Sequence, residues 1–196
     1  MTKINYLLTF LKLLISAIIY LLTLNLPGII FTEPYKDCML NDIGYIIIPD
    51  LSDYILIFDV VTCLLIPISL LCYIFGSDII KYHLNIFYHW VFIGYIISSS
   101  CQFFTSMPLT PNPSIIPGLS NDNIISNHAY NIGLLSIVLN KCKIISKKSM
   151  FFFIVIFGLL VIAVRIHYSV DVILSFWILY FSYNIWDNIE NKWLNY

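Results

Sequence analysis

The chain has 196 residues, of which 60% are hydrophobic and only 11% are charged, and its mean hydropathy is +0.88. A soluble domain carries about a quarter of charged residues, so this composition excludes a chain whose surface lies mostly in water. The formal net charge of −1 excludes a general electrostatic attraction to nucleic acid. The cysteines and histidines show no spacing typical of a metal site, and we expect neither a metal nor a cofactor.

Apolar windows recur along the chain at lengths that suit membrane helices. A hydrocarbon core about 30 Å thick needs roughly 20 apolar residues of helix. Six windows qualify, at residues 5–26, 54–75, 84–104, 128–143, 150–166 and 168–186. The first is expected to be a retained anchor, since its apolar stretch is too long for a cleaved signal peptide. The sequence therefore predicts an all-α polytopic membrane protein, with residues 1–196 forming a single six-span domain.

The positive charges predict how these spans are oriented. With six spans, both termini and the second and fourth loops share one side. Seven lysines fall on that side: Lys3, Lys81, Lys141, Lys143, Lys147, Lys148 and Lys192. Because cytosolic loops carry an excess of Lys and Arg, we expect both termini in the cytosol.

The opposite, lumenal or extracellular face then receives most of the residues that could carry chemistry. The first loop, the third loop and the short fifth turn all lie there. They hold six candidates: Asp50, Asp122, His128, Arg165, His167 and Asp171. The two remaining histidines, His83 and His89, fall toward the cytosolic end of the third span. Ionisable residues in or beside a span are costly and indicate a functional site.

His167 and Asp171 are four residues apart, so on a helix they share one face. A carboxylate that accepts from one imidazole nitrogen fixes the tautomer and leaves the other nitrogen free to act as a nucleophile. His128 could then serve as the general acid for a leaving oxygen. These residues favour phosphoryl transfer through a phosphohistidine. The alternative is structural, with Asp171 placed near the start of a helix because its charge suits the helix dipole.

Two blocks of the sequence carry a family resemblance. "SNDNIISNHA" followed by "RIHYSVDVILSFW" resembles the sphingomyelin synthase family, within the PAP2-like lipid phosphatase superfamily. "IIPD" and "CQFFTSMPLTPNPS" are similar to two further blocks of that family. The residues that match the two main blocks are Asp122, Ser126 and His128, and then His167, Tyr168, Ser169, Asp171 and Val172. The resemblance implies a PAP2-like helical bundle.

The resemblance also implies a role for each matched residue. His167 would attack the phosphorus of a phospholipid head group, with Asp171 orienting it. His128 would protonate the departing diacylglycerol and then deprotonate the acceptor, and Asp122 would support the histidine pair. Ser126 and Arg165 would complete the site. Asn127 and Ala129 depart from the family's Gly and Thr on either side of the first histidine.

The charge of the site favours a phosphodiester over a phosphate monoester. The phosphatase branch of the superfamily meets a doubly charged monoester with a Lys-x6-Arg-Pro block, which this chain lacks. One arginine and backbone N–H groups can satisfy the single charge of a diester. Asp50, Asp59 and Tyr168 could hold an ammonium head group by charge and cation–π contact. For Asp59 a helix–helix hydrogen bond is the alternative, and for Tyr168 an interfacial aromatic belt.

The leading hypothesis is a head-group phosphotransferase of the sphingomyelin synthase type. The donor would be phosphatidylcholine or phosphatidylethanolamine, and the acceptor ceramide or a diacylglycerol-type alcohol. A phosphatase or phospholipase C that uses water is the first alternative. A non-catalytic lipid-binding membrane protein is the second, which Asn127 and Ala129 favour. Golgi, endoplasmic reticulum and plasma membrane all stay open as locations.

Overall fold

The computed structural model describes residues 41–104 and 125–194, together with the isolated positions 8, 11, 12, 14, 15 and 18. All regular elements in this described part are helical, which confirms the predicted all-α class. In chain order they are α2 (Ile43–Ile47), the short 3-10 helix η1 (Ser52–Tyr54), α3 (Ile55–Phe75), α4 (Asp78–Phe104), α5 (Asn127–Lys141), α6 (Lys147–Ala163) and α7 (Ser169–Leu194).

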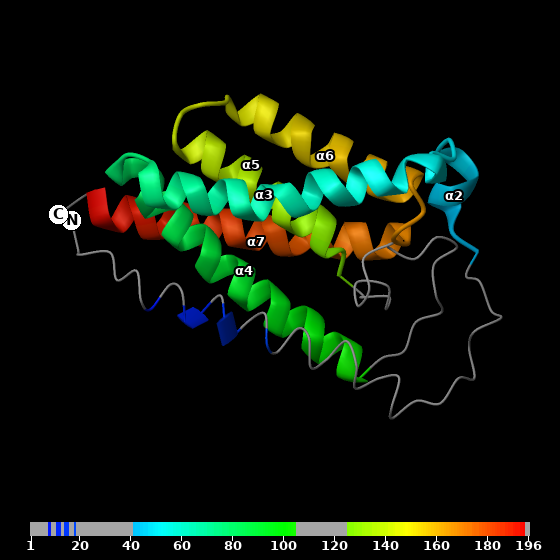
Figure 1. The fold of residues 1–196 in the computed structure, drawn as a ribbon, viewed down its shortest axis with the longest axis horizontal. Helices are drawn as coiled ribbons and strands as arrows, with labels where there is room; N and C mark the ends of the chain where they lie inside the picture. Colours follow the sequence, from blue (N-terminus) through cyan, green and yellow to red (C-terminus); the bar gives the residue numbers. More distant parts are fainter. Residues whose placement is uncertain are drawn as a thin grey trace.

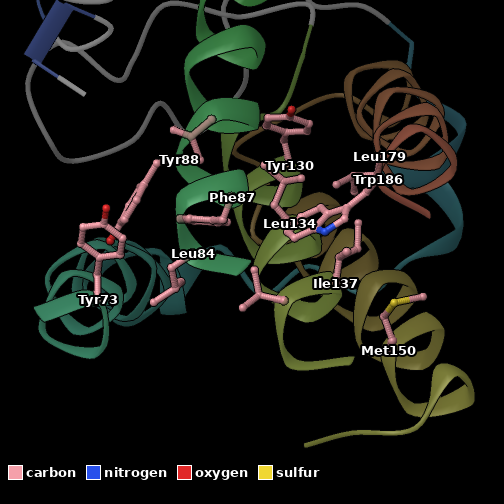
Figure 2. Packing of buried hydrophobic residues seen from close by; sticks show 12 residues of the cluster. Tyr73, Leu84, Phe87, Tyr88, Tyr130, Leu134, Ile137, Met150, Leu179 and Trp186 are labelled. Carbon is pink, nitrogen blue, oxygen red and sulfur yellow. The ribbon is translucent and has the colours of Figure 1, made fainter. Parts of the chain in front are cut away.

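Helix α5 is the centre of the bundle. It packs against α3, α4, α6 and α7, while α4 crosses the others obliquely (Figure 1). Tyr130 and Leu134 of α5 are fully buried, as is Trp186 of α7. Figure 2 shows these side chains meeting Leu84 and Phe87 of α4 in one apolar cluster. The hydroxyl of Tyr130 donates to the Trp90 carbonyl at 2.9 Å, so its burial leaves no donor unpaired.

Helix α3 presents a long apolar surface away from this core. With η1 it forms the stretch Ser52–Phe75, which among the described residues is the candidate membrane span by length and composition. Its exposed side chains include Leu56, Ile57, Leu64 and Ile68. A continuous apolar surface of this kind indicates contact with a membrane. The described part of the chain thus suggests a membrane-associated helical protein.

The other helices differ from the expected spans in their bounds. Helix α4 begins at Asp78, before the predicted residue 84, because an aspartate in the first turn favours a helix start. Helix α7 continues to Leu194, beyond the predicted residue 186. Helix α5 has 15 residues and is about 22 Å long at a rise of about 1.5 Å per residue, shorter than a bilayer core of about 30 Å. Most of the predicted first span lies outside the described residues, and the six-span arrangement stays a prediction.

Helix α6 ends at Ala163, three residues before the predicted end of its span. Its C-cap is Val164, and the next residue, Arg165, has a φ of 61°. A residue in this left-handed conformation ends a helix. As a result His167 lies in a turn between α6 and α7.

Candidate active site

The first turns of α5 and α7 are tied together by two serines. Ser126 caps α5 by accepting the Ala129 N–H at 3.2 Å, and its own N–H donates to the Asp171 carbonyl at 3.3 Å. The Ser175 hydroxyl donates to the Ser126 carbonyl at 3.1 Å and to the Asp171 carbonyl at 2.8 Å. These buried bonds fix the two helix starts relative to each other.

The two histidines of the sequence motifs meet at this junction. His128 lies in the first turn of α5 and His167 just before α7. His128 Nδ1 is 3.4 Å from His167 Nε2, and the ring centroids are 5.6 Å apart. The side chains are 8% and 3% exposed. Both imidazoles therefore lie side by side and are largely closed to water.

A carboxylate lies at the far side of each histidine. Asp59 Oδ1 from α3 is 3.4 Å from His128 Nε2, and Asp171 Oδ2 is 3.6 Å from His167 Nδ1. Asp171 Oδ2 also accepts the Tyr168 N–H at 3.0 Å, which holds the carboxylate in place. Asp59, His128, His167 and Asp171 thus form a continuous row, called the Asp–His–His–Asp row below. Such spacings are long for hydrogen bonds and are of the kind that tighten when a substrate binds.

The two histidines of the row have different surroundings. Burial lowers the pKa of His167, which lies outside the predicted spans, below its usual value. This shift favours the neutral imidazole of His167. With its Nδ1–H toward Asp171, its Nε2 carries the free lone pair. Asp59 is 1% exposed, and its carboxylate faces His128 Nε2, which leaves His128 Nδ1 directed toward His167. One histidine suits a nucleophile and the other an acid.

Arg165 is held in an unusual conformation two residues before His167, in the same turn. Its φ of 61° costs about 1 kcal/mol in a residue with a side chain. Nη2 donates to the carbonyls of Tyr45 and Ile48 at 2.9 and 3.1 Å, and Nε is 3.6 Å from Asp50 Oδ2. Nη1 is buried and has no hydrogen-bond partner among the described residues. A buried, unpaired guanidinium N–H is suited to receive an anion.

The remaining predicted site residues are distributed differently. Tyr168 is 1% exposed and stacks on Tyr45 with centroids 5.6 Å apart, inside the turn. The Asp50 side chain is 59% exposed. A hydrogen bond from the Ser52 backbone N–H lowers the pKa of Asp50. Asp122 lies outside the described residues. Asp59 does not join an open head-group surface but contacts His128.

Three residues with contacts at or next to the site, Ser175, Asp42 and Tyr45, were not predicted from the sequence. Ser175 could have been found, because it lies one helical turn after Asp171 on the same face. Asp42 and Tyr45 could not, because their contacts reach residues more than a hundred positions away. Within the described ranges no group of three or more His, Cys, Asp or Glu side chains is arranged to hold a metal ion.

A helical, membrane-associated protein with a buried Asp–His–His–Asp row is the class that this fold and site define. Residues 120–189 match the family model described as PAP2 superfamily C-terminal. The match includes both histidines and Asp171, and it supports a relationship to the PAP2-like superfamily. It is consistent with a lipid phosphatase-like enzyme that acts on membrane lipids. The comparisons with curated proteins and with solved structures found no match.

Proposed function

We propose that this protein is a lipid head-group phosphotransferase of the sphingomyelin synthase type. It would move phosphocholine or phosphoethanolamine from a glycerophospholipid to ceramide or a similar alcohol. The observation that carries this proposal is the 3.4 Å approach of His128 Nδ1 to His167 Nε2, between two carboxylates. Two imidazoles that face each other in this way can act on opposite sides of one phosphorus atom once a bound substrate parts them.

The first half of the reaction uses a neutral His167 and a protonated His128. The Nε2 lone pair of His167 attacks phosphorus, and the bond from phosphorus to the diacylglycerol oxygen breaks. His128 donates its proton to that oxygen, a contribution of roughly 10²–10⁴ in rate. Asp171 stabilises the positive charge that develops on His167. Diacylglycerol leaves, and the head group stays on His167 as a phosphohistidine.

The second half reverses these roles. His128, now neutral, takes the proton of the acceptor hydroxyl as its oxygen attacks phosphorus and the bond to His167 breaks. The head group ends on the acceptor, and both histidines regain their first protonation states. The two nitrogens, 3.4 Å apart in the structure, must separate by about 3 Å to admit a phosphoryl group, since reacting atoms approach to about 3–3.5 Å on each side of the phosphorus. Bound substrate therefore parts the two rings.

Two observations favour a lipid diester and a lipid acceptor. Arg165 is the only arginine of the sequence, and one guanidinium suits the single charge of a phosphodiester. The reacting side chains are nearly closed to water, since Asp171 is 0% and His167 3% exposed. Exclusion of water suppresses hydrolysis of a reactive intermediate and favours transfer to another lipid.

The test incubates the purified protein in detergent with fluorescent ceramide and either phosphatidylcholine or phosphatidylethanolamine. We expect a head-group-bearing ceramide product that is lost in His128→Ala and in His167→Ala. His89→Ala, a substitution of an exposed histidine on α4, is the matched control and should keep full activity. Release of free phosphocholine or phosphoethanolamine without a ceramide product would instead identify the hydrolase. Product that persists without either His128 or His167 would refute the mechanism.

A further inference from the structure

The helix α2 packs against the turn that carries His167, although Tyr45 and His167 lie 122 positions apart. Figure 1 shows α2 and the connection between α6 and α7 at the same end of the bundle. The Leu51 N–H, just after α2, donates to the Ala163 carbonyl at 2.8 Å. This segment therefore covers the end of α6 and the turn that follows.

Asp42 joins α2 to the start of α7 through a single carboxylate. Its Oδ1 accepts the Gly44 N–H at 2.7 Å and the Ser169 hydroxyl at 2.6 Å. Its Oδ2 accepts the Ser169 N–H at 2.5 Å. A Cβ at position 44 would lie 2.0 Å from Ser169 Oγ, so this close approach requires glycine. One side chain thus caps two helices that are distant in the sequence.

Tyr45 contacts the turn on three sides. Its hydroxyl donates to the His167 carbonyl at 3.1 Å, and its ring stacks on Tyr168. The guanidinium carbon of Arg165 lies 4.5 Å from the ring centroid, a cation–π contact. The same arginine donates to the Tyr45 carbonyl. Because residues 164–168 lie between two helices, they depend on such contacts for their conformation.

We propose that Asp42 and Tyr45 are positioning residues, and that α2 clamps the turn so that His167 faces His128 and Arg165 faces the bound phosphodiester. The contacts described for these two residues are with the turn, Gly44 and Ser169, and not with the facing nitrogens of His128 and His167. This role rests on the proposed function for its effect on rate, whereas the clamp itself can be measured without any substrate. Supporting contacts keep a reacting side chain in the geometry that the reaction requires. Loss of such a contact lowers kcat more than it weakens substrate binding.

The test compares Tyr45→Phe with Tyr180→Phe, which changes an exposed tyrosine of α7 in the same way. Tyr45→Phe keeps the ring and removes the hydroxyl that donates to the His167 carbonyl. We expect kcat for head-group transfer to fall roughly tenfold, the equivalent of one lost hydrogen bond, with KM unchanged. Ser169→Ala, which removes one of the three bonds to Asp42, should lower kcat by a smaller factor. Tyr180→Phe should match the wild type.

The second readout is the rate at which diethyl pyrocarbonate modifies His167, followed by mass spectrometry. His89 in the same molecule is the internal reference. We expect at least a threefold faster modification of His167 in Tyr45→Phe, at an unchanged rate for His89. An equal rate for His167 in the variant and the wild type would overturn the clamp. If the wild type transfers no head group but the modification rates differ as expected, the proposed function fails and the clamp stands.

Discussion

The contact between Asp59 and His128 yields the sharpest single prediction. Asp59→Asn keeps the size of the side chain and an oxygen acceptor but removes its charge. At 3.4 Å and an effective dielectric constant of about 20, the attraction between a carboxylate and an imidazolium is about 5 kcal/mol. Desolvation offsets part of this attraction, because Asp59 is buried. General-acid catalysis contributes roughly 10²–10⁴ in rate. We therefore expect kcat to fall by about 10²–10³.

The assay measures kcat and KM for transfer from phosphatidylcholine or phosphatidylethanolamine to fluorescent ceramide. The matched control is Asp53→Asn, which removes the charge of an exposed aspartate in η1 and should change neither constant. If Asp59 instead held the ammonium head group, Asp59→Asn would raise KM and leave kcat nearly unchanged. That pattern would refute the role assigned to Asp59 in the row.

Three further predictions follow from the geometry of the turn and the core. Arg165→Gly and Arg165→Ala should both lower transfer at least tenfold, because both remove the guanidinium. In chemical unfolding the glycine variant should be more stable than the alanine variant by about 1 kcal/mol, because glycine tolerates a φ of 61°. Equal stability of the two variants would contradict backbone strain at position 165. Burial lowers the pKa of His167, so the acid limb of the pH profile of kcat should lie below pH 6.5. The free energy of unfolding should decrease as the pH falls through 6.5, since the unfolded chain takes up the proton first. An acid limb above pH 6.5 would contradict a neutral buried nucleophile. Leu134→Ala should destabilise the fold by about 2–5 kcal/mol, whereas Ile144→Ala at an exposed position should cost under about 0.5 kcal/mol, with unfolding monitored by circular dichroism.

The helical class could be predicted because apolar composition leaves little else for a chain of this kind. The central position of α5 could not. Lys141 and Lys143 shorten the apolar part of its predicted span, residues 128–143, yet Tyr130 and Leu134 are completely buried. Hydropathy measures how apolar a segment is and not which neighbours cover it. The short α5 is covered by helices that precede it and by helices that follow it in the chain, and the hydropathy of one window does not detect such neighbours.

Part of the site could be predicted from local spacing. The four-residue spacing predicts that His167 and Asp171 share one face of a helix. In the structure His167 lies in the turn before α7, yet its Nδ1 is 3.6 Å from Asp171 Oδ2. Spacing could not assign Asp59 to His128, because the contact joins α3 to α5 across the bundle. The role of Asp42 could not be predicted for the same reason, since its partner Ser169 is 127 positions away. Contacts between distant segments arise from packing, which a single sequence does not display.

The central claim is that His167 Nε2 forms a covalent bond to the head-group phosphorus. The most direct measurement treats the purified protein with phosphatidylcholine or phosphatidylethanolamine and no acceptor, quenches at alkaline pH, and locates any adduct by tandem mass spectrometry. We predict a phosphocholine or phosphoethanolamine adduct on His167, which disappears when ceramide is added and is absent from His167→Ala. An adduct on His128, or turnover with ceramide in His167→Ala, would contradict it.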